Sequence, residues 1–278
     1  MTKTRDVPWL LLAAPVLFFA AFFVVPLTVV LLASITESKG SSLTVAHYVR
    51  VLADTYHWEV LWVTLRIALI TTLVSVLLGF PLAYYLVRIV EAQWLRRTGV
   101  ILIIIPLFTS NIVRSFGWMV LLGRTGLVND LMVSAGSIER PIRFLGTELG
   151  IVIGLVYILL PFIVLTVGNA LAAIDRTLEQ AAADLGARPL AVFKTITFPL
   201  VLPGLIAGAI MVFTLAVSAY VTPALLSSGR ITVFSILIFQ QYSSVFDFNF
   251  GGALSVTLLL ATLALVAFAT TLDPTRRR

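Results

Sequence analysis

The chain has 278 residues, of which 60% are hydrophobic and only 12% are charged, and its mean hydropathy is +1.07. A water-soluble domain needs far more charged surface than this, so the composition excludes a soluble protein and indicates an integral membrane protein. The net charge is +6 and there is no cysteine. Disulfides, thiolate metal sites and a cysteine nucleophile are therefore excluded.

Six apolar runs are each long enough to cross about 30 Å of hydrocarbon as a helix. The sequence therefore predicts an all-α membrane protein with six transmembrane helices. No linker marks a second domain, so we expect residues 1–278 to form a single transmembrane domain, and the first run is long enough to be a retained helix rather than a signal peptide. The predicted spans lie at about 8–34, 61–87, 99–122, 149–171, 200–224 and 252–272.

Six spans put both termini on one side of the membrane, and the basic residues indicate which side. Lys and Arg near span ends are retained in the cytoplasm. With the N-terminus inside, eleven of them lie in inner segments and six in outer segments, so both termini are predicted to be cytoplasmic. Basic residues along the cytoplasmic membrane surface also account for the pI of about 10.0, and we expect no nucleic-acid partner.

Two features of the region around the second span come first in chain order. His47 and His57 are the only histidines, and their spacing does not suit a metal site, so we expect exposed loop residues there. Arg66 follows Glu59 by seven residues, near the outer end of the second span. Its long side chain can reach the membrane interface from that position, which favours a structural role.

Arg114 is the second charge predicted to lie within a span, where burial in lipid is costly and a functional role is the first hypothesis. In a straight third helix that starts near Gly99, it lies roughly 22 Å along the axis, in the outer half. Its spacing from neighbouring polar and aromatic residues predicts one shared helical face. That face either lines a translocation cavity or holds neighbouring helices together. Its members are Asn111, Arg114, Ser115 and Trp118.

Acidic residues are absent from all six predicted spans. Asp247, in the last outer loop, is the nearest carboxylate, and Tyr157 of the fourth span is a further residue that we expect along the translocation pathway. The spans of this chain therefore do not predict a strong intramembrane site for a polycation.

The inner segment 172–199 has the local signals of a helix, a turn and a second helix. Residues 178–185 are rich in alanine, Gly186 can adopt the left-handed conformation that ends a helix, and Pro189 can open the next one. Small alanine side chains let a short helix lie close against a groove on a partner. An ordinary surface helix between two spans is the alternative.

This segment resembles the EAA pattern of ABC importer permeases, in which Glu-Ala-Ala is followed after three residues by Gly and later by Ile-x-Leu-Pro. Two positions differ, because Gln180 stands where the pattern has Glu, with Glu179 one place earlier, and Phe198 stands where it has Leu. The resemblance implies a cytoplasmic coupling loop that binds a separate ATPase. The coupling-loop candidates are Glu179, Gln180, Ala181, Ala182, Asp184, Gly186, Ile196 and Pro199.

The likeness extends from about residue 48 to 260 and includes the segments 79–86, 110–123, 154–162 and 250–255. Together they resemble the first permease of bacterial spermidine/putrescine importers. The resemblance implies a type I ABC importer permease in the bacterial cytoplasmic (inner) membrane. It also implies four partners: a second, distinct permease, two ATP-binding cassette subunits and an extracytoplasmic solute-binding protein.

No Gly-x-x-x-x-Gly-Lys-Ser/Thr sequence occurs in the chain. We therefore expect this chain to bind no cofactor and to have no enzymatic activity, with ATP and Mg²⁺ used by the partner ATPase. A stand-alone secondary transporter would need embedded acidic residues for coupling, and the spans contain none. A membrane-embedded enzyme would need a catalytic constellation, and the sequence has no nucleophile and base to form one.

The solute stays open at this point. The resemblance favours a polyamine such as spermidine or putrescine. The acid-free spans and Arg114 favour another small solute, because an uncompensated arginine repels a cation. An opine, an amino-acid-like compound or an organophosphonate is the alternative, and carboxylates from the partner permease would reconcile Arg114 with a polyamine.

Overall fold

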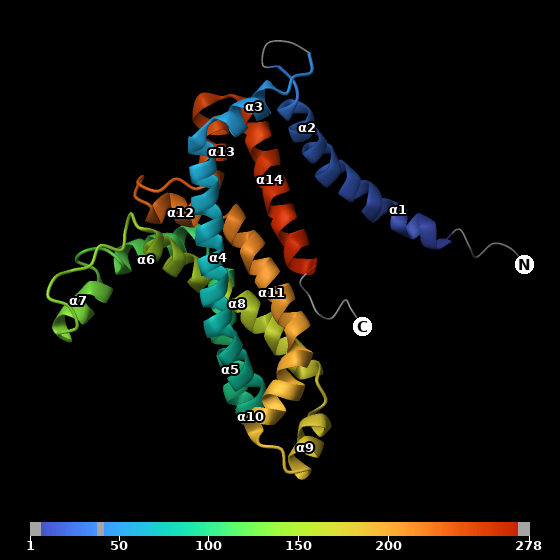
Figure 1. Cartoon of the computed structure of the whole chain (residues 1–278), viewed down its shortest axis with the longest axis vertical. Helices are drawn as coiled ribbons and strands as arrows, with labels where there is room; N and C mark the ends of the chain where they lie inside the picture. Colours follow the sequence, from blue (N-terminus) through green and yellow to red (C-terminus); the bar gives the residue numbers. More distant parts are fainter. Residues whose placement is uncertain (1–6, 38–41, 272–278) are drawn as a thin grey trace, which may run out of the picture. The chain divides into compact units, whose positions relative to one another are not determined.

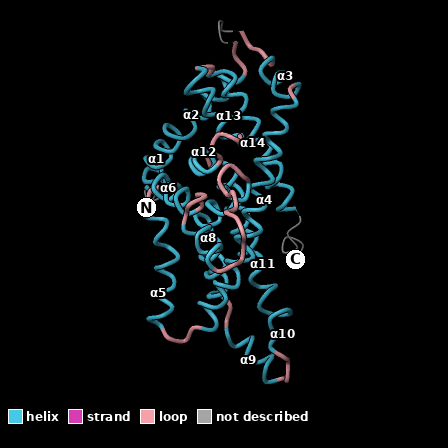
Figure 2. Tube along the Cα trace, turned by 90° about the vertical axis from the view of Figure 1, so that its left-hand side faces the viewer, coloured by secondary structure: helices cyan, strands magenta, loops and turns pink. Residues whose placement is uncertain are grey.

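The computed structural model describes residues 7–37 and 42–271, with side-chain placement from Leu12 onward. Both termini, which the charge distribution predicts to be cytoplasmic, lie outside the described residues. The described chain is helical apart from loops and one isolated bridge between Thr36 and Leu43 (Figures 1 and 2). Its helices are α1 (Val7–Phe19), η1 (Ala20–Val24), α2 (Val25–Ser34), α3 (Ala46–Ala53), α4 (Thr55–Tyr84), η2 (Tyr85–Ile89), α5 (Gln93–Ile104), η3 (Ile105–Phe108), α6 (Asn111–Leu121), α7 (Leu127–Ser134), α8 (Glu148–Ala173), α9 (Arg176–Asp184), α10 (Pro189–Val192), η4 (Phe193–Thr197), α11 (Phe198–Ser218), α12 (Val221–Leu226), α13 (Phe234–Gln240), η5 (Gln241–Val245) and α14 (Phe248–Thr271).

Five helices in the described part of the chain are long and apolar enough to cross a membrane, and a bent pair makes six when it counts as one span. They overlap the first, second, fourth, fifth and sixth predicted spans, although the last predicted residue, Leu272, lies outside the described residues. The five are Leu12–Ser34, Thr55–Ile89, Glu148–Ala173, Pro189–Ser218 and Phe248–Thr271.

The third span is not the straight helix that hydropathy predicts over 99–122. The chain forms α5, a short 3-10 turn at Ile105–Phe108, two extended residues and then α6, with a bend of 102° between the two helical parts. Pro106 cannot donate a helical backbone hydrogen bond, and Thr109 is already extended with φ −98° and ψ 151°. The predicted depth of Arg114 along a straight axis is therefore wrong, because the axis turns before Arg114.

The fifth span also differs from its predicted bounds of 200–224. One continuous helix, which includes η4, runs from Pro189 to Ser218, so Pro199 lies within it rather than at its entrance. At the other end Ala219 is extended, with φ −63° and ψ 127°, and α12 begins separately at Val221.

The chain divides into two compact units: a terminal unit of Met1–Glu59 and Leu237–Ala261, and a central unit of Val60–Ile236 and Thr262–Arg278. In the central unit α8 and α11 form the most extensive helix pair (Figure 1). Gly204 and Gly208 are four residues apart on α11, and a methyl group on either would overlap a residue of α8, Ala170 or Thr166. Glycines at this spacing let two membrane helices approach closely.

The core of the central unit lies around the first half of α8. Seven buried residues form one apolar cluster that joins α4, α8, α12 and the segment before α13. Thr64 of α4 adds a polar contact, since its hydroxyl accepts a 2.8 Å hydrogen bond from the backbone N–H of Phe234 at the start of α13. The cluster consists of Ile67, Ile151, Val152, Leu155, Val156, Leu226 and Val233.

The terminal unit corrects the expectation of two exposed loop histidines. His47 lies on α3 and His57 on α4, and the His57 side chain is buried, with 6% of the residue exposed. Both rings lie beside the Phe250 ring, with centroid distances of 6.4 Å and 5.6 Å. Asn249 connects this part of α14 to the end of α2 through hydrogen bonds of 2.9 Å to backbone oxygens.

Candidate functional site

Helix α9 begins with a side-chain cap. Asp175 is the N-cap residue, and its Oδ1 accepts a 2.9 Å hydrogen bond from the backbone N–H of Thr177. This bond, and after it one from the Thr177 side chain, lowers the pKa of Asp175 because both stabilise the charged carboxylate. Glu179 lies in the first turn, where the helix dipole favours a negative charge. Local chemistry therefore determines where α9 starts.

Gly186 ends α9 in the left-handed conformation, with φ +82°. Its N–H donates to Ala183 O at 2.9 Å, and the N–H of Ala187 donates to Ala182 O at 3.0 Å, which is the pattern of a Schellman motif. Pro189 then occupies the first position of α10. The chain here has the helix, left-handed turn and second helix that the local signals predict.

Glu179 forms interactions with two other elements. Arg88, in η2 at the end of α4, has its Nη2 atom 3.3 Å from Glu179 Oε1. The hydroxyl of Thr197, just before α11, donates a 2.7 Å hydrogen bond to the same oxygen. The Arg88 side chain is 7% exposed and that of Glu179 is 21% exposed. Breaking an ion pair this poorly solvated leaves an uncompensated charge, which makes the contact costly to lose.

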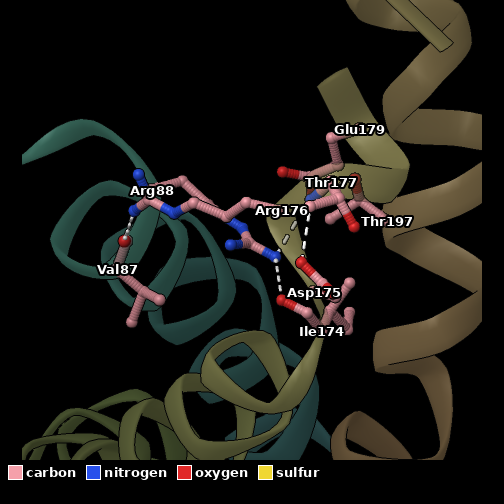
Figure 3. Close-up of polar contacts among 8 residues, drawn as sticks. All are labelled: Val87, Arg88, Ile174, Asp175, Arg176, Thr177, Glu179 and Thr197. Carbon is pink, nitrogen blue, oxygen red and sulfur yellow. Dashed lines mark hydrogen bonds and ion pairs between the residues drawn. The ribbon is translucent and has the colours of Figure 1, made fainter. Parts of the chain in front are cut away.

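A second arginine crosses in the opposite direction (Figure 3). Arg176, the first residue of α9, donates to the Val87 carbonyl at 2.8 Å, while Arg88 donates to the Ile174 carbonyl at 3.3 Å. Together these contacts hold α9 to the ends of α4, α8 and α11. We call the set Arg88, Arg176, Glu179 and Thr197 the arginine clamp.

The remaining coupling-loop residues present a mostly exposed surface. Gln180, Ala181, Asp184 and Pro199 are exposed, and Ala182 and Ile196 are partly buried. Three leucines add apolar surface at the end of the molecule formed by α9 and α10, since Leu178 is 49%, Leu185 89% and Leu190 64% exposed. Exposed alanines and leucines beside the polar Gln180 and Asp184 give this end a surface of small, apolar and polar side chains, which is suited to packing into a groove of another protein.

The sequence did not reveal the arginine clamp. The EAA resemblance drew attention to the shift of Glu from position 180 to 179, but not to its partners. Arg88 is an isolated arginine after the second span, and Thr197 is an unremarkable threonine before the fifth. Only the fold brings these residues together with Glu179.

The structure places all four predicted third-span residues on α6, in one region of the central unit. Arg114 donates to Asn111 Oδ1, and Ser115 lies 3.0 Å from the hydroxyl of Thr222 on α12. The Trp118 ring meets that of Tyr157 on α8 edge-on, with centroids 5.3 Å apart. These contacts link α6 to α12 and α8.

Asn111 and Arg114 line a cavity of about 460 Å³ together with residues of α8, α11 and α12. None of its lining residues is acidic. Two guanidinium nitrogens of Arg114, Nε and Nη1, are buried and have no hydrogen-bond partner. The cavity therefore contains one positive charge that the residues around it do not neutralise.

Asp247 and Arg66 have structural partners that the sequence did not indicate. Asp247 belongs to the terminal unit, where its Oδ1 accepts a 3.0 Å hydrogen bond from the Phe250 N–H at the start of α14. Arg66 pairs with Glu148 at the beginning of α8. Within residues 7–37 and 42–271, no group of three or more His, Cys, Asp or Glu could hold a metal ion.

Solved structures with this fold are membrane subunits of ABC importers. A bacterial ABC transporter involved in the import of the acidic polysaccharide alginate superposes with a TM-score of 0.79, over 98% of this chain and 96% of that chain, at 18% identity. The helical fold of the chain is therefore that of an ABC importer permease. No family model matches the sequence.

Two curated relatives identify the family. The chain is 35% identical to the spermidine/putrescine transport system permease protein PotB of Salmonella typhimurium, over 78% of this chain and 75% of that protein. It is 31% identical to PotB of Haemophilus influenzae, over 89% and 88%. The chain therefore belongs to the PotB family of spermidine/putrescine transport system permeases. It is an ABC importer permease subunit of the inner membrane, not an enzyme.

Proposed function

We propose that this chain forms one half of the translocation pathway of an ATP-driven importer for a polyamine, spermidine or putrescine. The identity of 31–35% to PotB proteins over most of the chain carries this proposal. A second, distinct permease forms the other half, and a solute-binding protein delivers the polyamine from outside. Two ATP-binding cassette subunits bind ATP and Mg²⁺ and supply the energy.

The ATPase binds the segment at 172–199. Helix α9 exposes alanines and a leucine beside polar side chains, and the arginine clamp ties it to three membrane helices. Closure of the ATPases on ATP then moves α9 together with the ends of α4, α8 and α11. A rigid connection is needed, because a flexible one would absorb the movement instead of transmitting it to the cavity.

The termini face the cytoplasm, and the bent pair of α5 and α6 serves as the third of six spans. With this orientation α9 is cytoplasmic, in agreement with the excess of Lys and Arg in the inner segments. The cavity that Asn111 and Arg114 line is then part of the pathway. Ser115, Trp118 and Tyr157 do not line it, and they support it through the contacts of α6 with α12 and α8. Asp247 lies in the last outer loop.

One observation favours a second candidate, an importer of a small anionic solute. A cation about 4 Å from the Arg114 guanidinium would be opposed by about 4 kcal/mol at an effective dielectric of 20. The cavity has no carboxylate of its own to offset this repulsion. A polyamine therefore requires acidic residues from the partner permease, whereas a carboxylate- or phosphonate-bearing solute would bind Arg114 directly.

The test is purification of a tagged chain from its native membrane in mild detergent, followed by mass spectrometry of the associated proteins. Recovery of an ATPase, a second permease and a binding protein supports the importer, whereas recovery of the chain alone under conditions that preserve other ABC complexes contradicts it. Uptake of labelled spermidine and putrescine into proteoliposomes then tests the solute. If the solute is a polyamine, Arg114→Ala should leave its uptake intact or raise it. If the wild type instead takes up an anion and Arg114→Ala does not, the chain belongs to an importer of a small anionic solute.

A further inference from the structure

Three arginines surround one pocket near the start of α8. The pocket has a volume of about 370 Å³ and is lined by Arg124, Arg143 and Arg230, each from a different loop of the central unit. All three residues are exposed. The remaining lining residues are Leu122, Phe144, Leu145 and Ser228. We call this feature the arginine pocket.

A buried asparagine joins two of these loops. Asn129 of α7 is fully buried, and its Nδ2 donates to Gly123 O at 2.8 Å and to Ile142 O at 3.0 Å. Its Oδ1 accepts a 2.8 Å hydrogen bond from the Ile142 N–H. Residues 123 and 142 are the immediate neighbours of Arg124 and Arg143. The backbones that carry these two arginines are therefore held together.

A tight turn fixes the third arginine. Ser228 and Gly229 have φ values of +48° and +71°, and the N–H of Arg230 donates to Ser227 O at 2.9 Å, as in a type I′ turn. The Arg230 side chain then crosses the backbone at Gly146, where a methyl group would come within 2.9 Å of its Cδ. The Gly146 N–H donates to Leu226 O at 2.9 Å, which fastens this loop to the one that carries Arg143.

The arginine pocket has no internal counter-charge. None of its lining residues is acidic, and the three side chains make no hydrogen bond or ion pair with any other described residue. Holding three like charges around one pocket disfavours the free protein. A bound anion relieves this repulsion and meets donors already in place, so little ordering is required on binding. Arginine forks match carboxylates and phosphates, because two parallel hydrogen bonds can form.

The position of the arginine pocket along α8 indicates which side of the membrane it faces. Helix α8 starts five residues after Arg143 and ends three residues before α9. Its 26 residues span about 39 Å at 1.5 Å per residue. The arginine pocket and α9 therefore lie at opposite ends of one membrane-length helix. If α9 is cytoplasmic, the pocket opens on the outer side, where a binding protein delivers solute.

We propose that the arginine pocket is a docking site for an acidic side chain of the extracytoplasmic solute-binding protein. This inference rests on the proposed function, which supplies that partner. The position of the pocket favours a protein carboxylate, because loops at the outer end of α8 form it and the binding protein docks on that side in the proposed importer. Uncompensated surface charges also accelerate encounter with a partner of opposite charge.

The experiment measures binding of the co-purified, solute-loaded binding protein to the whole importer in nanodiscs. Arg143→Glu and Arg230→Glu are compared with wild type and with Arg140→Glu, an exposed arginine of the same outer segment that does not line the pocket. Each pocket variant is expected to weaken binding about tenfold or more, and Arg140→Glu less than about twofold. The affinity of the wild-type importer for the binding protein should decrease as NaCl is raised from about 50 mM to about 300 mM. The affinity of the pocket variants should depend less on salt.

Equal binding by wild type, pocket variants and control would overturn the inference and leave the importer function intact. Failure of the wild-type importer to bind any binding protein would instead contradict the proposed function itself. Normal protein binding with loss of bound phospholipid in native mass spectrometry would overturn the inference in favour of a lipid. Where a Glu variant does not assemble, Arg143→Gln and Arg230→Gln remove the charge without reversing it, and the same comparison applies.

Discussion

The two ends of α8 differ in how their arginines are neutralised. At the end next to α9, Arg88 pairs with Glu179 and Arg176 donates to a backbone carbonyl, so both clamp arginines have partners within the chain. At the other end, the arginines of the arginine pocket have no partner among the described residues. The end with the paired clamp arginines exposes alanines and leucines, which bind a partner by packing. An end with unsatisfied charges binds by electrostatic attraction, which salt weakens.

This difference suits the two partners of an importer. An ATPase stays attached through the cycle and must transmit movement, which requires a packed and rigid contact. A binding protein must arrive and leave in each cycle, which favours fast association through charge. Variants that break the rigid end should therefore lower transport while the complex remains assembled, and variants at the charged end should weaken docking of the binding protein.

The largest effect is expected for Gly186→Val. A β-branched side chain is strained at φ +82°, with about 1–2 kcal/mol lost for the left-handed conformation alone, so the reversal after α9 is disrupted. No atom lies within 4 Å of the added Cβ, so backbone strain rather than a clash is responsible. ATP-driven uptake in proteoliposomes should fall more than about tenfold, since 1.4 kcal/mol corresponds to a factor of ten. The protein should still insert.

Gly136 provides a matched control for this prediction. It ends α7 with φ +68°, has the same pair of Schellman hydrogen bonds, and also has open space around its Cβ position. Gly136→Val therefore introduces a comparable strain away from the coupling loop and should retain most of the uptake. Gly186→Asn should also transport, because asparagine tolerates the left-handed region. Normal uptake by Gly186→Val would contradict the role of this turn.

An intermediate loss of uptake is expected when a residue of the arginine clamp is replaced. Arg88→Ala leaves Glu179 with the Thr197 hydroxyl as its remaining partner among the described residues, so α9 is held less firmly to α4. Uptake per ATP hydrolysed should fall about tenfold, because a poorly solvated charge loses its ion-pair partner. Glu179→Ala should have a similar effect, and the double variant should be little worse than either single one. Additive losses in this double-mutant cycle would show that the two residues act independently.

Thr197→Val is a finer test of the same contact. Valine keeps the shape of the buried side chain and removes only the hydroxyl that donates to Glu179. A hydrogen bond to a charged group is stronger than one between neutral groups, so a measurable loss of coupling is expected. It should be smaller than that of Arg88→Ala, because the ion pair remains.

Local signals in the sequence predicted the helices and the turn of the coupling segment, but they did not predict the contacts of the arginine clamp. Alanine-rich residues, Gly186 and Pro189 each act on the backbone nearby, so the helix, turn and helix at 176–192 follow from the order of residues. The pairing of Arg88 with Glu179 and the convergence of three loops at the arginine pocket depend on distant parts of the chain. No spacing within the sequence encodes them.

The third span shows a second limit of prediction from sequence, which concerns the direction of a helix. Hydropathy over 99–122 is high in the two helices on either side of the bend, and a hydropathy average does not respond to a change of direction. The signal that could have indicated the bend was Pro106 followed by the polar residues Thr109, Ser110 and Asn111. Proline weakens helical continuity, and Ser and Asn favour helix starts, so these residues together mark a break.

The smallest effect is expected at the cap of α9. Asp175→Ala removes the acceptor for the Thr177 N–H, so the first turn of α9 should exchange its amide hydrogens faster, with only a modest loss of uptake because the clamp still holds the helix. Asp184→Ala is the control, since it removes a carboxylate from the same helix that caps nothing. Equal exchange in the two variants would exclude a capping role for Asp175.

The pH dependence of this cap has a defined direction. The pKa of Asp175 is lowered in the folded protein, so the carboxylate stabilises α9 fully above its unfolded pKa of about 3.9. This stabilisation is lost as the pH falls through the lower folded value. Hydrogen exchange at Thr177 should therefore be protected at neutral pH and should lose that protection only below about pH 4, after correction for the intrinsic exchange rate. In Asp175→Ala the protection should be absent at both pH values, and a wild-type transition near pH 6 would point to another group.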